Sequence, residues 1–567
     1  MTAIQKNIPE VPLRSPKTVM RLARLGSFHQ CRLSFMRTLL RRLKREKWEF
    51  ERPKFEINNI GVGVAIYTAK GPMRTYSLVC FAHDLPPEQR SDRVIAEAWD
   101  STFALFDGVP DSRDIERLSQ DVPKQEAGRV TNREICLSRA NRSGRLFEYV
   151  IDCLSSGQQP DREQIDTVGY VMRTTAVYGS GKFGAADHEA IADRPEFAGT
   201  FQAEMLTVFL IRTFVLDLIE HMARERAPEV AVPLDPALRR QFGVGNSTGL
   251  GLAPFIVNHP VLLNNWIVAR ETALARVRAL PQACAAEIDM FHKMLFRAQT
   301  NVDDWRSTHE LQIQKLALLK SDLDTLYKHL NTNPFEEEFP WNRLYQWAEE
   351  NLSAEGQEQL VSLMMEPYGE IVDGVTSCMG ADESAAFRIN GAMTLDALSD
   401  IVEDIYGWAL KIDWTSRDNL ARVWYVSEEK LEPRLGERFE ELIEPYEQPL
   451  APGRDVARLY KDIADWDKNA IIADFVLRHP EHRHIVRRVQ IVAKYPYAEI
   501  QDNTIGSTLV PIDLLRCKLS FFGATHFDPR SDRWVRINMF KNAPFPHELA
   551  NVDVDDWSYA TPSENPR

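Results

Sequence analysis

Five leucines near the middle of the chain repeat at alternating spacings of three and four residues, and this pattern limits the fold more than any other. They are Leu316, Leu319, Leu323, Leu326 and Leu330. The spacing places them on one face of an α-helix, and that face must pack against another helix. The apolar segment 288–295 is the expected partner, because the short link at 301–304 favours an antiparallel pair. This pair, residues 286–330, would pack within one chain or form a homodimer contact.

A different pattern precedes the helical middle. Apolar residues alternate along 60–66, a Lys-Gly-Pro turn follows at 70–72, and β-favouring residues fill 75–81. Two such runs joined by a turn predict a β-hairpin. A charged, loop-rich stretch follows the hairpin, which predicts a domain boundary near residue 130.

The C-terminal part, after the Pro-Leu-Ala-Pro-Gly sequence at 449–453, favours β-structure again. Strands are predicted at 489–492, 519–522 and 534–540. The last two flank Asp-Pro-Arg-Ser-Asp at 528–532, a turn sequence that predicts a second hairpin.

Together these patterns predict an α+β fold that is predominantly helical. The expected domains are 1–130, with a basic helix and a hairpin; 131–450, a large helical domain with two Gly-rich loops; and 451–567, a mixed α/β module. With 567 residues, 44% apolar and 26% charged, the chain resembles folded proteins rather than disordered ones.

The most apolar stretch, 205–219, is interrupted by Arg212 and Asp217. It is also shorter than the roughly 20 residues that a membrane span needs. We therefore predict a buried core helix and no transmembrane segment. Seven scattered cysteines without a CxxC pair argue against a disulfide framework. Residues 1–14 lack the apolar core of a secretory signal, so we expect a cytoplasmic protein.

The charge balance argues against generic binding to polyanions. There are 82 acidic and 68 basic residues, giving a formal net charge of -14, so no strong nucleic-acid signal is present. Residues 17–48 are the exception, because they predict an amphipathic helix with a basic face. That helix would dock onto an anionic partner or pack on the acidic body of this protein itself.

The stretch 243–251 has four glycines around small polar residues. Glycines allow backbone N–H groups to turn toward a ligand, and a following helix N-terminus favours a phosphate or carboxylate. We predict that this loop binds a small anionic ligand, with Arg240 supplying positive charge. The predicted contacts are Gly245, Asn246, Ser247, Thr248 and Gly249. The alternative is a tight turn whose Ser and Thr cap the next helix.

A second glycine-rich stretch, Gly-Ser-Gly-Lys-Phe-Gly at 179–184, formally contains GxGxxG. It lacks the long helix of a dinucleotide-binding fold, and Phe183 stands where a Walker loop needs Ser or Thr. We predict that Ser180 and Gly181 contact the anion and that Lys182 acts in catalysis, as a base or nucleophile. The alternative is an exposed loop lysine.

His259 follows the first loop closely and is a candidate general acid or base, with Asn264 offering an amide to the substrate. The alternative is that His259 or Asn258 caps a helix beginning at Pro260. The histidines at 479, 482 and 484 lack carboxylate or cysteine partners at ligand spacing, so we predict a charged turn and no metal site.

These features favour a cytoplasmic enzyme acting on a small anionic substrate, such as a phosphate, carboxylate or CoA-like molecule. The loops 179–184 and 243–251 would bind it, and neither the reaction nor a cofactor is specified. One alternative is a non-catalytic interaction or scaffold protein that uses the basic helix and the leucine face. Another is a ligand sensor with the same pocket and no turnover.

Overall fold

In the computed structural model the chain forms two compact units, and each unit combines two separate segments of the sequence. One, here called the sheet unit, comprises 29–249 and 518–567; the other, the helical unit, comprises 1–28 and 250–517. The expected division at 130 and 450 stays a prediction. The structure describes residues 11–86, 98–122, 131–174, 191, 193–199, 201–246, 260–305, 310–332, 335–376, 379, 387–416, 424–427, 433–434, 447–450, 452–501, 511–524, 526–527 and 537–557.

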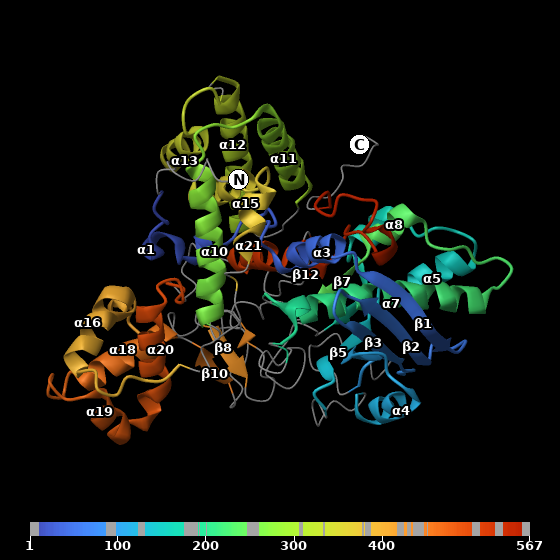
Figure 1. Cartoon of the computed structure of the whole chain (residues 1–567), viewed down its shortest axis with the longest axis horizontal. Coiled ribbons are helices and arrows are strands. Elements are labelled where there is room, and N and C mark those ends of the chain that lie inside the picture. Colours follow the sequence, from blue (N-terminus) through green and yellow to red (C-terminus); the bar gives the residue numbers. More distant parts are fainter. Residues whose placement is uncertain are drawn as a thin grey trace. The chain divides into compact units, whose positions relative to one another are not determined.

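A nine-stranded sheet organises the described part of the sheet unit, in the order β1-β2-β3-β4-β5-β6-β7-β12-β11. The strands are β1 (Glu49–Ile57), β2 (Gly63–Lys70), β3 (Thr75–Ala82), β4 (Ser101–Asp107), β5 (Glu134–Arg142), β6 (Tyr170–Thr174), β7 (Gly243–Asn246), β11 (His526–Phe527) and β12 (Ile537–Met539). Neighbours pair antiparallel, except that β6 and β7 are parallel. The sheet therefore joins strands from both ends of the chain (Figure 1).

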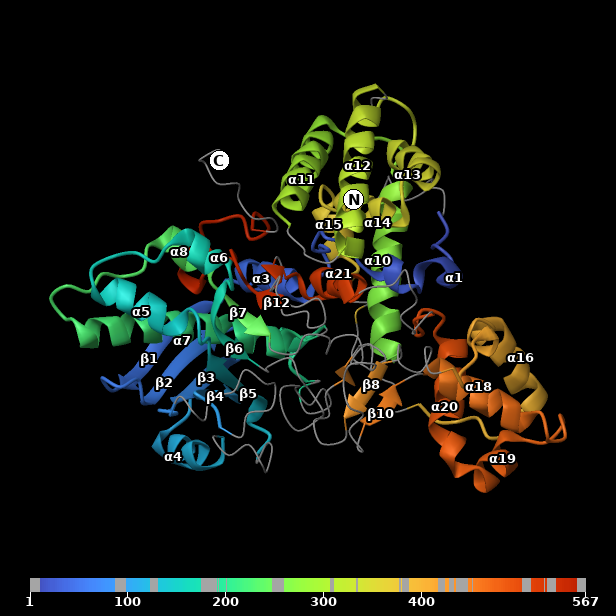
Figure 2. The ribbon, with the colours of Figure 1, turned by 180° about the vertical axis from the view of Figure 1, so that it is seen from behind.

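Helix α7 (Gln202–Arg226) packs along one face of this sheet (Figures 1 and 2). Phe214 of α7 meets Phe103 of β4 and Tyr67 of β2 edge-to-face. The predicted core helix at 205–219 is therefore confirmed. Helix α4 (Ser112–Asp121) packs on the opposite face through Leu118. No helix in the described residues is long and apolar enough to cross a bilayer.

The sheet unit also contains α3 (Phe35–Arg45), α5 (Phe147–Ser155), α6 (Arg162–Asp166) and α8 (Pro236–Gln241). Helix α3 is the core of the predicted basic segment, and its arginines make contacts inside the unit. Arg37 and Arg41 each lie 3.0 Å from Asp555, and Arg32 lies 3.1 Å from it. Arg42 donates to the carbonyl of Glu196 at 2.7 Å. These contacts favour packing within the protein over docking onto an anionic partner.

The helical unit begins with two short helices, α1 (Pro16–Val19) and α2 (Leu22–Leu25). It continues with the helices α10 (Pro260–Arg278), α11 (Ala285–Asp304), α12 (Glu310–Thr332), α13 (Pro340–Asn351) and α14 (Ala354–Met364), followed by the short α15 (Gly369–Asp373). Gln299 of α11 donates to Asp324 of α12 at 3.0 Å, and Asp303 pairs with Lys320. The two helices are thus antiparallel neighbours within one chain, as the leucine spacing predicts. A homodimer contact through them stays a prediction.

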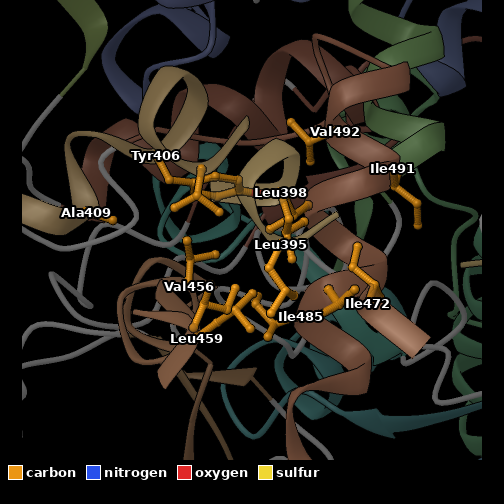
Figure 3. Packing of buried hydrophobic residues seen from close by; sticks show 14 of the residues in the cluster. Leu395, Leu398, Tyr406, Ala409, Val456, Leu459, Ile472, Ile485, Ile491 and Val492 are labelled. Carbon is orange, nitrogen blue, oxygen red and sulfur yellow. The ribbon is translucent and has the colours of Figure 1, made fainter. Parts of the chain in front are cut away.

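A separate apolar cluster in the helical unit is built from α16 (Leu395–Tyr406), α18 (Pro452–Ile463), α19 (Ile472–Arg478) and α20 (Arg483–Lys494). Figure 3 shows side chains from all four helices in this cluster, among them Leu398, Val456, Ile472 and Ile485. Three short strands, in the order β10-β8-β9, form a small sheet in the same unit. They are β8 (Trp424–Ser427), β9 (Pro433–Arg434) and β10 (Glu447–Leu450).

Some expected strands are correct and others are wrong. The hairpin expected at 60–81 is β2 paired with β3, and 534–540 contains β12. However, 489–492 lies in α20, and 519–522 lies in α21 (Pro511–Phe522). Residues Ile485, Val489 and Val492 are spaced to share one helical face, and burying that face outweighs the β-preference of the branched side chains. The middle, expected to be helical, also carries β5, β6 and β7, so the fold is mixed α and β.

Candidate functional site

The parallel strands β6 and β7 lie next to each other, and β6 precedes one glycine-rich stretch while β7 forms the start of the other. Thr174, the last residue of β6, is paired with Asn246, the last residue of β7. The stretch 179–184 follows β6 and the stretch 247–251 follows β7. The last described residues before the two stretches are therefore side by side. In sheets with parallel strands, ligands bind outside the carboxyl ends of those strands.

Polar side chains form a row across the sheet beside these strand ends. Thr102 of β4 is paired with Arg139 of β5, and Asn141 of β5 is paired with Arg173 of β6. Because side chains alternate along a strand, these four lie on the same face as Leu137, which is the face packed by α4. We call Thr102, Arg139, Asn141 and Arg173 the polar row. Arg173 is only 6% exposed, so its charge is largely removed from bulk water.

An aromatic ring and a histidine flank the polar row. The guanidinium of Arg139 lies 4.3 Å from the centre of the Trp99 ring, a cation–π contact. His83 Nε2 lies 3.1 Å from the Thr102 hydroxyl. Burial lowers the pKa of His83, although the charge of Asp100 opposes this effect. The imidazole is therefore neutral at neutral pH and can either donate or accept a proton.

Hydrogen bonds between main chain and side chain hold the neighbouring strand ends in register. The Asp100 N–H donates to Asn141 Oδ1 at 3.0 Å, and the Arg142 N–H donates to Asp100 Oδ2 at 2.9 Å. On the face packed by α7, the hydroxyls of Ser138 and Thr174 are 2.6 Å apart. The polar row thus stands on a rigid part of the sheet, where its geometry can be set before a ligand binds.

Most predicted site residues fall outside the described part of the chain. They are Ser180, Gly181, Lys182, Ser247, Thr248, Gly249 and His259. Gly245 and Asn246 lie in β7, and a Cβ atom on Gly245 would lie 2.8 Å from the Tyr170 ring. This glycine is therefore needed for close packing of β6 on β7.

Two further predicted residues have clear structural partners. Arg240, near the end of α8, pairs with Glu548 at 3.1 Å. Asn264 lies on α10 in the helical unit, where its Oδ1 accepts a hydrogen bond from the Tyr497 N–H at 3.1 Å. Binding roles for Arg240 and Asn264 stay predictions.

The sequence reasoning did not identify Arg139, Asn141 and Arg173. The sequence does contain a pattern that could have indicated them. Polar residues occur at alternate positions at the end of β5, at Arg139 and Asn141, and another polar residue, Arg173, follows in β6. Charged side chains that are removed from bulk water are concentrated at functional sites, so a strand that contains a buried arginine is a candidate site.

The described residues contain no group of three or more His, Cys, Asp and Glu side chains that could hold a metal ion. In the histidine-rich turn, His482 is paired with Asp462 at 2.7 Å and His484 with Asp455 at 3.3 Å. Each imidazole thus has its own carboxylate rather than sharing one centre.

No protein-family model, no curated protein and no solved structure matches this chain.

Proposed function

We propose that this chain is an enzyme whose small anionic substrate binds where β6 and β7 end. The observation that carries the proposal is the parallel pairing of Thr174 with Asn246, from which both glycine-rich stretches continue. Backbone N–H groups of such stretches suit a phosphate or carboxylate. Arg139 and Arg173 add positive charge from the adjacent strands, and guanidinium groups bind these anions through paired hydrogen bonds.

In this proposal Lys182 and His259 carry the chemistry. Each lies in a stretch that continues from one of the two parallel strands. A lysine near a bound anion stabilises negative charge that develops in a transition state, and a histidine transfers a proton. The interaction-protein alternative is weaker, because Arg37 and Arg41 of the basic helix are engaged with Asp555.

Replacing Arg173 by glutamine is expected to weaken binding of inorganic phosphate by about tenfold to a hundredfold, the value of one hydrogen bond to a charged group. Isothermal titration calorimetry on the full chain measures the dissociation constant. The control is Arg145→Gln, which removes an exposed arginine just after β5. Equal phosphate affinity in folded Arg173→Gln and in the unmodified protein would contradict a role for the polar row.

Native mass spectrometry of the freshly purified chain, compared with its denatured mass, identifies any retained small molecule. With a molecule found in this way as substrate, Lys182→Met and His259→Ala should each reduce turnover by about a hundredfold or more while the protein stays folded. Full turnover in both variants would rule out this catalytic assignment. Binding without turnover in the unmodified protein would instead identify a ligand sensor.

A further inference from the structure

Helix α12 has two faces that follow the spacing of helix packing. Its leucine face is buried, and Leu319 and Leu323 are almost completely enclosed. The other face, here called the α12 stripe, is exposed and repeats at alternating spacings of four and three residues. The stripe consists of Ile313, Ala317, Lys320, Asp324, Tyr327 and Asn331. This spacing aligns one side of a helix with a neighbouring helix. The stripe therefore has the pattern of a helix-packing surface, although it faces solvent.

Helix α11 extends the same surface. Gln299 of α11 donates to Asp324 of α12 at 3.0 Å, so these two positions face each other across the antiparallel pair (Figures 1 and 2). One turn further along each helix, Phe296 comes opposite Tyr327. Phe296 is 66% exposed, Ile313 is 50% exposed and Tyr327 is 47% exposed. Large apolar side chains that gather on one surface among polar residues are typical of a protein–protein contact.

The α12 stripe is complementary to itself. When a second α12 runs antiparallel across the first, Lys320 of one copy can lie opposite Asp324 of the other, and twofold symmetry repeats this contact. In the same register, Tyr327 of one copy lies opposite Ala317 of the other, so a large side chain meets a small one. The stripe therefore matches a second copy of itself in both charge and size.

The surface is also large enough for a dimer. In this register the contact runs along α12 from Ile313 to Asn331, which lie opposite each other at its two ends. Helix α12 has 23 residues and α11 has 20. Their common face is thus about 35 Å long and about 20 Å wide, or about 700 Å². Each partner in a stable interface contributes roughly 800 Å², so this face is close to the required size.

We propose that two copies of this chain associate through the α12 stripe, and that α11 and α12 of the two copies form an antiparallel four-helix bundle. The leucine face is not the contact, because it is buried within one chain. The dimer contact is independent of the proposed anion site, since the stripe belongs to the helical unit and Thr174 and Asn246 belong to the sheet unit. Failure of one proposal therefore leaves the other intact.

Sedimentation velocity of the full chain, from nanomolar to high micromolar concentrations at physiological ionic strength, tests this contact. We expect a reversible equilibrium between monomer and dimer. Lys320→Asp places two carboxylates opposite each other twice in every dimer, so it should weaken the dimer by about tenfold or more. The double variant Lys320→Asp with Asp324→Lys restores opposite charges between the copies, and it should recover the dimer affinity of the unmodified chain.

The double variant separates contacts between chains from contacts within one chain. Position 320 faces Asp303 of the same chain in both variants, so repulsion between these two positions does not distinguish them. Circular dichroism checks that each variant is folded. A monomer at every concentration would overturn the proposal, and so would a double variant that dimerises no better than Lys320→Asp.

Tyr327→Ala provides a second test that does not change the charge. It removes the large side chain that meets Ala317 of the other copy, so the dimer should weaken by about tenfold. The matched control is Leu477→Ala, because Leu477 lies on α19 and is 81% exposed. Equal dimer affinity in Tyr327→Ala and Leu477→Ala would contradict a contact through the α12 stripe.

Discussion

Replacing Arg14 by methionine is expected to destabilise the helical unit by about 3–5 kcal/mol, the usual cost of removing one partner from a buried ion pair. Arg14 Nε lies 2.8 Å from Glu271 of α10, and Arg14 Nη1 lies 2.7 Å from Glu358 of α14. All three side chains are almost completely buried. Without Arg14, two carboxylates would lose their strongest partner in a poorly solvated interior, and α10 and α14 would lose one of their links to the N-terminal segment.

The matched control is Lys17→Met. Lys17 lies three residues away and pairs with Asp404 at 2.8 Å, but these side chains are 64% and 69% exposed. A surface pair of this kind contributes about 0–1 kcal/mol. Hydrogen exchange of peptides from α10 and α14, read by mass spectrometry, measures both variants. If protection of these peptides is the same in Arg14→Met and Lys17→Met, the buried cluster is not a stabilising centre.

The pH dependence of stability gives a second test of the buried cluster of Arg14, Glu271 and Glu358. Burial raises the pKa of Glu271, but the charges and hydrogen bonds of Arg14 and, to a smaller extent, Arg270 together lower it by more, so the net shift is downward. This stabilisation is complete above the ordinary glutamate pKa of about 4.3, and it is lost as the pH falls through the lower value in the folded state. Arg14→Met removes the larger of these two lowering contributions. The variant and the parent should therefore converge in stability as the pH falls below about 4.

Replacing Arg212 by methionine is expected to destabilise the sheet unit by about 3–5 kcal/mol, because three carbonyls would each lose a charged donor. The fully buried guanidinium donates to the carbonyls of Phe242 at 2.7 Å, Ala543 at 2.8 Å and Arg240 at 3.0 Å. It also lies 4.0 Å from the centre of the Phe545 ring. One side chain on α7 thus fixes both the start of β7 and the turn after β12.

The control for Arg212→Met is a substitution of Arg226, which lies on the same helix. Arg226 pairs with Asp152 and Glu148 and is 43% exposed, so Arg226→Met should cost less than about 1 kcal/mol. Hydrogen exchange in β7 and β12 should rise strongly in Arg212→Met and stay unchanged in Arg226→Met. An unaffected β7 in Arg212→Met would show that the three carbonyls find other donors at little cost.

Local sequence signals predicted the elements whose partners are close in sequence. The hairpin of β2 and β3 and the antiparallel pair of α11 and α12 both depend on short connections and clear periodicity. The remainder of the large sheet depends on pairing between distant segments. For example, Gly245 pairs with both Arg173 and Asn538, and no local pattern specifies either partner. The run 489–492 was assigned to a strand because branched residues gave a stronger local signal than their helical spacing.

The candidate site could be predicted only in part. The two glycine-rich stretches are recognisable in the sequence, but periodicity does not encode the parallel pairing of β6 with β7, the strands that precede them. Arg139 and Arg173 were not predicted, because residues 131–450 were expected to be helical and no strand was predicted where β5 and β6 lie. Only the pairing across β4, β5 and β6 shows that they form one row.

The interleaving of the two units has a consequence for synthesis on the ribosome. The sheet unit requires residues 518–567, and the segment 1–28 belongs with residues 250–517. The first 28 residues must therefore wait for partners that are translated hundreds of residues later, and the sheet lacks β11 and β12 until residues 526–539 have been translated. The helical unit is complete only after residue 517 has emerged, and the sheet unit only later still. A stop codon before β12 would leave the edge of β7 unpaired, which favours degradation or aggregation of the truncated product.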